Sequence, residues 1–490
     1  MLTPPQPSDP GTLLTPIPWT WRRLLLFGAS LVLVAVCAHA LTLASPGFYS
    51  HDEWQKFDLV KSIGFWHFAA DYGTPQVGPD FGFPMRPIGF LQQGVASLWM
   101  QSHPWLAHLV GVLNQALAAL VFCCVLRQAG FSLAVVTLAP TLFVLSPLTT
   151  LATGWLAASF DQLYVVFLLT VAAVLVTLRE RGITMPGAAV ILFGTTAALL
   201  SKETAIVAPG VVLLIGFVDW SRHRRSYSWR LYGVAFALVL APVAAYLWYR
   251  APAIAGSLHG HGLPVYTPSL ANVPDNVIRY FAFPFLVDVD GMGAMVWVSP
   301  ARVVGALAIH AILVATLCLR FGGWVIAAYL GGYFLFLIPV LPLPTVSDHY
   351  LYASGLITAL ALALALEHAF MRRYRLLSAL LIACAVMLGV QTYSIESMIY
   401  ATGVCQSRFL DSLDALVNRG GPGIGTIQVT SDPGAPEHIA MRSVFARIRY
   451  EKEGTAMVHF GTTPTTEGLA NANPARTRVH LTQECKLRVD

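Results

Sequence analysis

The fold of this 490-residue chain is decided by one apolar run and the acidic pair that follows it. Residues 24–43 read LLLFGASLVLVAVCAHALTL, and residues 50–54 read SHDEW. An apolar helix of about 20 residues crosses a hydrocarbon core about 30 Å thick. Two adjacent carboxylates at the end of such a span, Asp52 and Glu53, need water or a partner. They therefore mark either an ordinary solvated loop or a place where chemistry occurs.

The composition of the whole chain agrees with this membrane span. The sequence is 56% hydrophobic and only 11% charged, whereas soluble globular proteins have about 25% charged residues. Apolar runs recur as far as about residue 396 and are absent from residues 400–490. We therefore predict a polytopic α-helical membrane protein with a disordered tail at 1–20, a membrane module at 21–398 and a small soluble α/β domain at 399–490.

Arginines predict the topology of the membrane module. Arg22 and Arg23 precede the first span, which places the N-terminus in the cytoplasm because positive residues stay on that side. Each later turn that is predicted to lie inside also carries arginine. The acidic pair and the C-terminus then lie outside the cytoplasm, in a multi-pass protein of a bacterial inner or plasma membrane. About 11 spans are predicted, at 24–43, 105–126, 131–149, 157–178, 186–200, 204–219, 231–249, 302–319, 323–341, 351–370 and 377–395.

Two long external loops are expected, at 45–104 and 250–301. In the first loop, residues 54–68 mix aromatic side chains with lysine and aspartate, which is typical of an amphipathic helix that lies on the membrane surface. Residues 88–100 are apolar but too short to span, so we expect a second interfacial helix there. The Gly- and Pro-rich stretch at 73–84 connects the two helices beside a cleft.

Charged residues from distant parts of the chain fall on the same predicted side as the acidic pair. They are Arg86, Lys202, Glu203, Arg279 and His349. Carboxylates beside cations suit a base that acts next to a phosphate group. Structural roles are the alternative for each: an ion pair between short helices for Lys202 and Glu203, contact with lipid headgroups for Arg86, an ordinary loop position for Arg279, and a helix cap for His349.

The cysteines bear on the compartment of the C-terminal domain. Cys405 and Cys485 bracket the polar tail, and a disulfide between them is expected if the tail lies in an oxidising compartment. No cysteine or histidine spacing is typical of a zinc site. In the tail we expect helices at 407–417 and 437–450, and strands at 425–430, 456–460 and 477–489, in a domain that recognises an acceptor, covers the groove as a lid or acts as a structural cap.

Several motifs together resemble those of GT-C glycosyltransferases over residues 24–398. The chain is most similar to transmembrane O-mannosyltransferases, with lipid A aminoarabinose transferases as a second comparison. The tetratricopeptide repeats of the former are absent, and His349 stands where that family has arginine. The matching motifs are the acidic pair, Arg86-Pro87-Ile88, His108-Leu109-Val110 with Asn114, Ser146-Pro147 with Trp155, Ser201-Lys202-Glu203 with Ala205 and Pro209, and Asp348-His349-Tyr350-Leu351-Tyr352.

The resemblance implies an inverting enzyme that moves a sugar, mannose-like or another hexose or pentose, from a polyprenyl phosphate to a hydroxyl of a protein, lipid or glycan outside the cytoplasm. Asp52 is the expected base, and Glu53 orients it or the acceptor. The expected phosphate ligands are Arg86, Lys202, Arg279 and His349. The expected groove residues are His51, Trp54, Glu203, Tyr350 and Tyr352. No cofactor is required, no metal ligands are indicated although a divalent metal is compatible, and no nucleic-acid partner is expected.

Two other functions are alternatives. An O-antigen polymerase or ligase also handles polyprenyl-linked glycans, but such enzymes have their functional residues in a large later loop, whereas the acidic pair here lies in the first. A transporter or flippase of lipid-linked glycans typically has internal repeats and polar residues at the middle of the membrane. Here the polar residues gather at one face.

Overall fold

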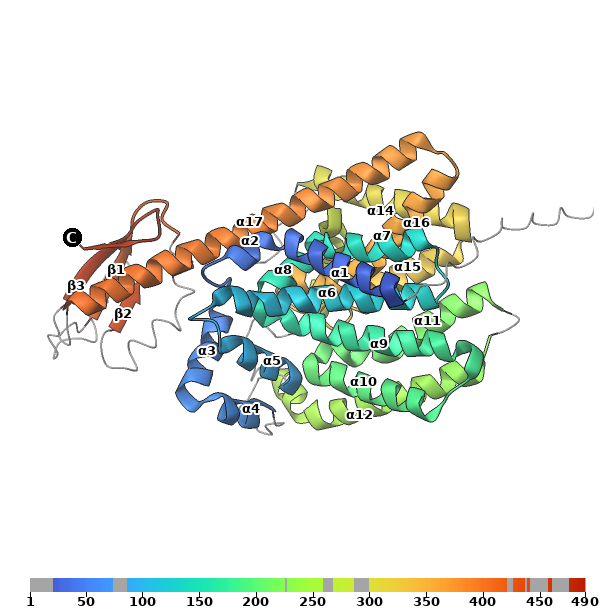
Figure 1. The fold of residues 1–490 in the computed structure, drawn as a ribbon, viewed down its shortest axis with the longest axis horizontal. Coiled ribbons are helices and arrows are strands. Elements are labelled where there is room, and N and C mark those ends of the chain that lie inside the picture. Colours follow the sequence, from blue (N-terminus) through green and yellow to red (C-terminus); the bar gives the residue numbers. More distant parts are fainter. Residues whose placement is uncertain are drawn as a thin grey trace, which may run out of the picture.

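A computed structural model describes residues 21–73, 86–224, 227–258, 268–285, 299–420, 426–436, 439–440, 457–460 and 476–489. The chain forms a bundle of helices, and its last helix leads to a small sheet at one side (Figure 1). The long helices are α1 (Trp21–Ala38), α6 (Pro104–Gln128), α7 (Leu133–Val144), α8 (Pro147–Gly154), α9 (Ser159–Arg181), α10 (Met185–Ser201), α11 (Ala208–Arg222), α12 (Trp229–Leu258), α14 (Pro300–Phe321), α15 (Trp324–Leu335), α16 (Tyr352–Met371) and α17 (Arg375–Gly420).

The remaining helices lie in the connections between these along the chain. They are α2 (Ala40–Ala44), α3 (His51–Ile63), α4 (Phe65–Gly73), α5 (Pro87–Ser97), α13 (Val273–Ala282) and the 3-10 helices η1 (Leu156–Ala158), η2 (Glu203–Val207), η4 (Leu270–Asn272), η5 (Phe283–Phe285) and η6 (Asp348–Leu351). The predicted tail at 1–20 lies outside the described residues, as does the connector at 73–84 beyond Gly73.

The structure contains fewer full-length apolar helices than the predicted number of spans. In the described part of the chain, seven helices are long and apolar enough to cross a membrane, or eight if one bent pair is a single span, and three further apolar helices are shorter. The bent pair is α7 and α8, which meet at 52°. Pro147 starts α8, and proline disfavours helical geometry in the residue before it. The chain is therefore a multi-pass membrane protein, and the predicted span at 131–149 is broken rather than straight.

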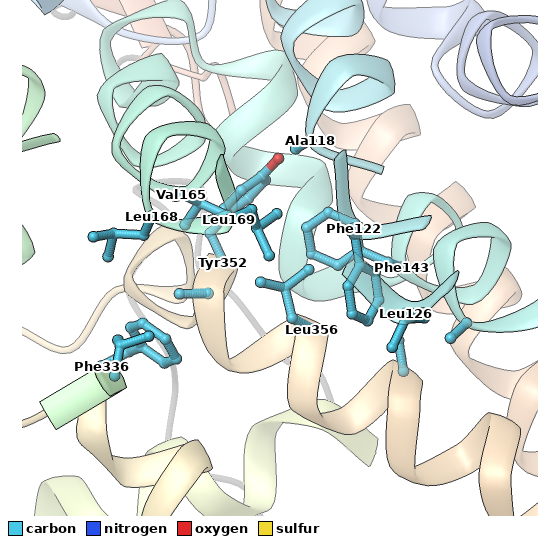
Figure 2. Packing of buried hydrophobic residues seen from close by; sticks show 14 of the residues in the cluster. Ala118, Phe122, Leu126, Phe143, Val165, Leu168, Leu169, Phe336, Tyr352 and Leu356 are labelled. Atoms are coloured by element: carbon cyan, nitrogen blue, oxygen red, sulfur yellow. The ribbon is translucent and has the colours of Figure 1, made fainter. Parts of the chain in front are cut away.

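The core of the bundle lies around α16, between α6, α7 and α9. Figure 2 shows Tyr352 of α16 beside Leu356, with Phe143 of α7 and Phe122 of α6 packed against them. The Tyr352 hydroxyl donates to Gln115 Oε1 at 2.6 Å, so this polar group is satisfied inside the core. The alternating Ala-Leu sequence at 359–366 gives α16 small side chains that allow close helix approach.

The first loop differs from the prediction of one helix at 54–68. Two helices, α3 and α4, occupy this region, and Gly64 between them has a φ of 82°, a left-handed conformation that glycine adopts without a steric penalty. Helix α3 also begins earlier, at His51, because Ser50 and Glu53 form a capping box. The second interfacial helix is α5, with Pro87 in its first turn.

The C-terminal unit contains four strands in the order β2-β1-β3-β4. They are β1 (Thr426–Ser431), β2 (Met457–Phe460), β3 (Arg476–Leu481) and β4 (Leu487–Val489). Strand β1 is parallel to β2 and β3, while β3 and β4 are antiparallel. The prediction of one strand at 477–489 was wrong, because the chain turns between β3 and β4. Of the predicted helix at 437–450, only residues 439–440 are described.

Helix α17 joins the membrane module to this sheet without a break. It contains 46 residues and includes both the last predicted span and the predicted helix at 407–417. Phe409 and Leu413 near its end pack against Ile427 and Val479 of the sheet. The predicted domain boundary at 398–399 therefore falls inside a continuous helix.

Candidate active site

The two members of the acidic pair have different environments in the first turn of α3. Glu53 is 2% exposed, and its Oε2 accepts a hydrogen bond from the Ser50 backbone N–H at 3.1 Å. Burial, together with the charge of Asp52, holds the pKa of the Glu53 carboxyl well above its ordinary value. Asp52 is half-buried. Glu53 thus stabilises the start of the helix, while Asp52 is presented from it.

Lys56 lies one helical turn after Asp52 and was not predicted as a site residue. Its ammonium group is buried over the ring of Phe90, 4.8 Å from the ring centre, in a cation–π contact. Burial lowers the pKa of Lys56 to about 8, with Asp52 raising it and Arg86 lowering it. The i, i+4 spacing from Asp52 was the available sequence signal.

Arg86 precedes α5 and pairs with a residue 117 positions later. Its Nε donates to Glu203 Oε2 at 2.7 Å, and its Nη2 donates to Glu203 Oε1. The guanidinium also lies over the ring of Phe160, 5.1 Å from the ring centre. This two-pronged pairing fixes Arg86 in the plane of a carboxylate, which is the geometry that arginine also uses for phosphate.

Lys202 forms a second ion pair beside the first. Its Nζ donates to Asp161 Oδ2 at 2.5 Å, and the two side chains are 4% and 1% exposed. The ammonium group also lies 4.8 Å from the ring centre of Tyr350. Asp161 was not predicted as a site residue. A single acidic residue at the start of an otherwise apolar span was the signal that could have indicated it.

Aromatic side chains border the ion pairs. The ring of His349 packs edge-on against the ring of Trp155, with 5.0 Å between the ring centres. The ring centres of His349 and Tyr350 are 4.2 Å apart. Ser347 Oγ is 2.7 Å from His349 Nδ1. His349 is buried within this aromatic group, so it lies next to the cations rather than on an open surface.

Four more residues were expected at the site. Tyr352 belongs to the bundle core described above. Arg279 pairs with Asp275 on its own helix, at 2.8 Å. Trp54 packs against Phe48. His51 starts α3, and its side chain lies outside what the structure describes.

The residues that do come together form what we call the ion-pair cluster. Its members are Asp52, Lys56, Arg86, Asp161, Lys202 and Glu203. Three cations face three carboxylates, so the cluster has no large net charge. Among the described residues, no group of three or more His, Cys, Asp or Glu is arranged to hold a metal ion.

An open groove of about 400 Å³ lies between α3 and α5. Its walls are mostly apolar, and Lys61 is its one charged lining residue. This groove lies toward the end of α5, about 16 Å along the helix from Arg86. The lining residues are Phe57, Val60, Lys61, Phe65, Ser97, Leu98, Gln101 and Ser102.

No protein-family model and no curated protein sequence matches this chain. Among solved structures, an oligosaccharyltransferase of Archaeoglobus fulgidus is similar at 12% identity and a TM-score of 0.47, over 88% of this chain and 62% of that one. AglB of the same organism, solved with an inhibitory peptide and a dolichol-phosphate, is similar at 14% identity and a TM-score of 0.45, over 94% and 62%.

A third similar structure is ArnT from Cupriavidus metallidurans. It has 12% identity and a TM-score of 0.48, and the match covers 90% of this chain and 86% of that one. The chain spans only about 62% of the length of the two archaeal chains. Function therefore has to come from the residues of the site.

Proposed function

We propose that this protein is a GT-C-type glycosyltransferase that moves a sugar from a polyprenyl-phosphate carrier to a hydroxyl acceptor. The observation that supports it most is the ion-pair cluster, in which the first turn of α3 presents Asp52 near Lys56, whose charge also interacts with that of Arg86. A carboxylate next to several cations provides a base and a phosphate site within one small volume. The motifs shared with O-mannosyltransferases and aminoarabinose transferases support the same reaction class.

The donor phosphate is assigned to the cations of the cluster. A polyprenyl phosphate is a good leaving group when nearby positive charge stabilises it, and it needs no proton to depart. Arg86 is the more accessible cation, with a side chain 19% exposed against 4% for Lys202. We therefore assign the direct phosphate contact to Arg86, and assign Lys202 to holding Asp161 and the surrounding charge in place.

The acceptor hydroxyl is assigned to Asp52. Its carboxylate takes the hydroxyl proton while the acceptor oxygen attacks the anomeric carbon from the side opposite the phosphate. The new carbon–oxygen bond forms as the bond to the phosphate oxygen breaks, and the phosphate leaves with that electron pair. One displacement inverts the anomeric centre. Glu53, which caps α3, supports Asp52 without touching the acceptor.

The finer parts of this proposal follow the resemblance. The sugar is mannose-like or another hexose or pentose, and the acceptor is a protein, lipid or glycan hydroxyl. The site faces the extracytoplasmic side, with the N-terminus in the cytoplasm and the C-terminal sheet outside. His349 and Tyr350 border the donor site, while Arg279, expected there as a phosphate ligand, pairs with Asp275 on its own helix.

A transfer assay tests the proposal. Purified protein in lipid nanodiscs is given a panel of polyprenyl-phosphate sugars, and the parent is compared with Asp52→Asn and Glu53→Gln. We expect Asp52→Asn to lower kcat about a hundredfold or more, because a general base is lost. Glu53→Gln keeps an acceptor for the Ser50 N–H, so its kcat should stay within about threefold of the parent.

The two matched amide variants make the test specific for the base. Full activity in Asp52→Asn would remove the assigned base and most of the mechanism. Equal losses in both variants would instead show that the pair acts only through the structure of α3, and melting curves would then show matching losses of stability.

A further inference from the structure

The segment at 45–50, between α2 and α3, carries none of the groups that the proposed chemistry uses, yet it is buried. Ser45, Phe48 and Tyr49 are at most 2% exposed. This segment determines where α3 begins, and hence where Asp52 lies. The contacts that hold it therefore set the position of the proposed base.

Side chains from two distant helices hold the backbone of this segment. The Phe48 N–H donates to Gln406 Oε1 at 2.8 Å, although the two residues are 358 positions apart. On the other side, the Gly47 carbonyl accepts a hydrogen bond from His108 Nε2 at 3.0 Å. Gln406 is buried, so water does not readily replace it as the partner of Phe48.

The same face of α17 makes further contacts with the chain before α3. Glu396 accepts hydrogen bonds from the backbone N–H and the hydroxyl of Thr42, at 2.9 and 2.8 Å. A Cβ atom added to Gly47 would lie only 2.4 Å from the backbone oxygen of Gly403, so the two backbones touch. Figure 1 shows α17 passing beside α2 before it reaches the strands.

These α17 residues form one stripe. Glu396, Gly403 and Gln406 are spaced by seven and three positions, which places them on one face of a helix. Phe409 and Leu413 continue this face onto the sheet. Cys405, next to Gln406, is joined by a disulfide to Cys485 in the turn between β3 and β4. The sheet and the segment before Asp52 are therefore attached to the same helix.

We propose that Gln406 is a positioning residue for Asp52, through its hydrogen bond to the backbone of Phe48, and that α17 thereby links the C-terminal sheet to the acid site. This inference rests on the proposed function for its catalytic consequence. It concerns a residue that touches neither the sugar nor the phosphate. Its distinguishing property is that the contact requires an acceptor atom at position 406, not a charge or a particular volume.

Three variants separate positioning from a general packing role. Gln406→Leu removes the acceptor with little change in size. Gln406→Glu keeps an acceptor oxygen. Gln391→Leu is the matched control, because Gln391 also lies on α17 and its Nε2 donates to a backbone oxygen, that of Phe285, at 3.2 Å.

Hydrogen–deuterium exchange of the whole chain measures how firmly the backbone of this segment is held. This measurement does not depend on transfer activity. In Gln406→Leu, we expect the amides of residues 47–52 to exchange about tenfold faster, because a local opening becomes easier. In Gln391→Leu, the same peptide should exchange at the parent rate. Gln406→Glu should restore slow exchange.

Steady-state kinetics then measure the catalytic consequence. We expect kcat to fall about tenfold in Gln406→Leu with an unchanged KM for the donor, because the base is displaced while the phosphate ligands are not. Gln406→Glu should recover most of that loss. A KM change without a kcat change, or an equal kcat loss in the Gln391 control, would overturn the positioning role.

The two measurements distinguish failure of this inference from failure of the proposed function. Parent-like exchange in Gln406→Leu overturns the inference whatever the activity. If the parent transfers no sugar from any donor, the proposed function fails, and faster exchange confined to Gln406→Leu still supports the link between α17 and the segment.

Discussion

Helix α9 has an ion pair at each end, and the two pairs differ. Asp161, in its first turn, meets Lys202 at 2.5 Å, with side chains 1% and 4% exposed. Arg179, in its last turn, meets Asp219 at 3.4 Å, with side chains 28% and 7% exposed. Both pairs have the charge order that the helix dipole favours, with the acid at the N-terminus and the base at the C-terminus. Only the pair of Asp161 and Lys202 has both side chains buried and its charged groups in close contact.

The helix dipole favours the charges at both ends of α9, and the rule of positive turns accounts for Arg179, but neither explains why the pair of Asp161 and Lys202 is buried. The rule that positive residues stay on the cytoplasmic side accounts for the partly exposed Arg179 at the end of α9. A buried lysine–aspartate pair costs desolvation energy that topology does not demand. The buried pair lies in the ion-pair cluster, so its cost is consistent with a role in holding charge for chemistry.

Breaking the buried pair should have the largest effect. Lys202→Met leaves the Asp161 carboxylate buried without its partner, and such losses cost about 3–5 kcal/mol of stability. We expect a clear fall in the melting temperature and near-complete loss of transfer. The double variant Asp161→Asn/Lys202→Met removes both charges and should regain stability but not activity. Recovered activity in the double variant would make the pair purely structural.

The pH dependence of donor binding should show an intermediate effect. Lys56 is protonated below its pKa of about 8 and loses its charge as the pH rises through that value. The cluster then has one positive charge fewer, so KM for the donor should rise in alkaline solution. Lys56→Arg keeps the positive charge at every accessible pH. In this variant, KM for the donor should change little with pH. An identical alkaline rise in Lys56→Arg would assign the titration to another group.

Changing the pair of Arg179 and Asp219 should have the smallest effect. Arg179→Gln removes a partly exposed ion pair, which contributes about 1 kcal/mol or less. We expect transfer activity within about twofold of the parent and a small change in melting temperature. The same assay and melting curves measure both quantities. A loss as large as that of Lys202→Met would erase the proposed difference between the two ends of α9.

Much of the architecture could be predicted from local sequence. Apolar runs predicted that the chain crosses the membrane several times, and the spacing of Ser50 and Glu53 accounts for the start of α3. The break at Gly64 and the turn between β3 and β4 were missed, because one glycine or a few turn residues decide them. The continuity of α17 was missed because its composition changes from apolar to polar while its helical geometry continues.

The site was less predictable, because its contacts join distant residues. Nothing near Arg86 in the sequence indicates that its partner is Glu203, 117 positions later. Asp161 lies within an apolar run and carries no motif of its own. Tyr352 follows His349 and Tyr350 closely, yet one helical turn directs it into the core. Sequence order could suggest candidates, whereas pairing depends on which helices become neighbours.

The length of α17 has a consequence for geometry outside the membrane. Its 46 residues correspond to about 69 Å at 1.5 Å per residue, more than twice the hydrocarbon thickness of about 30 Å. A large part of this helix therefore stands clear of the lipid. The sheet at the end of α17 is therefore held at a fixed distance from the membrane surface. A molecule that binds to the sheet is held at that same distance.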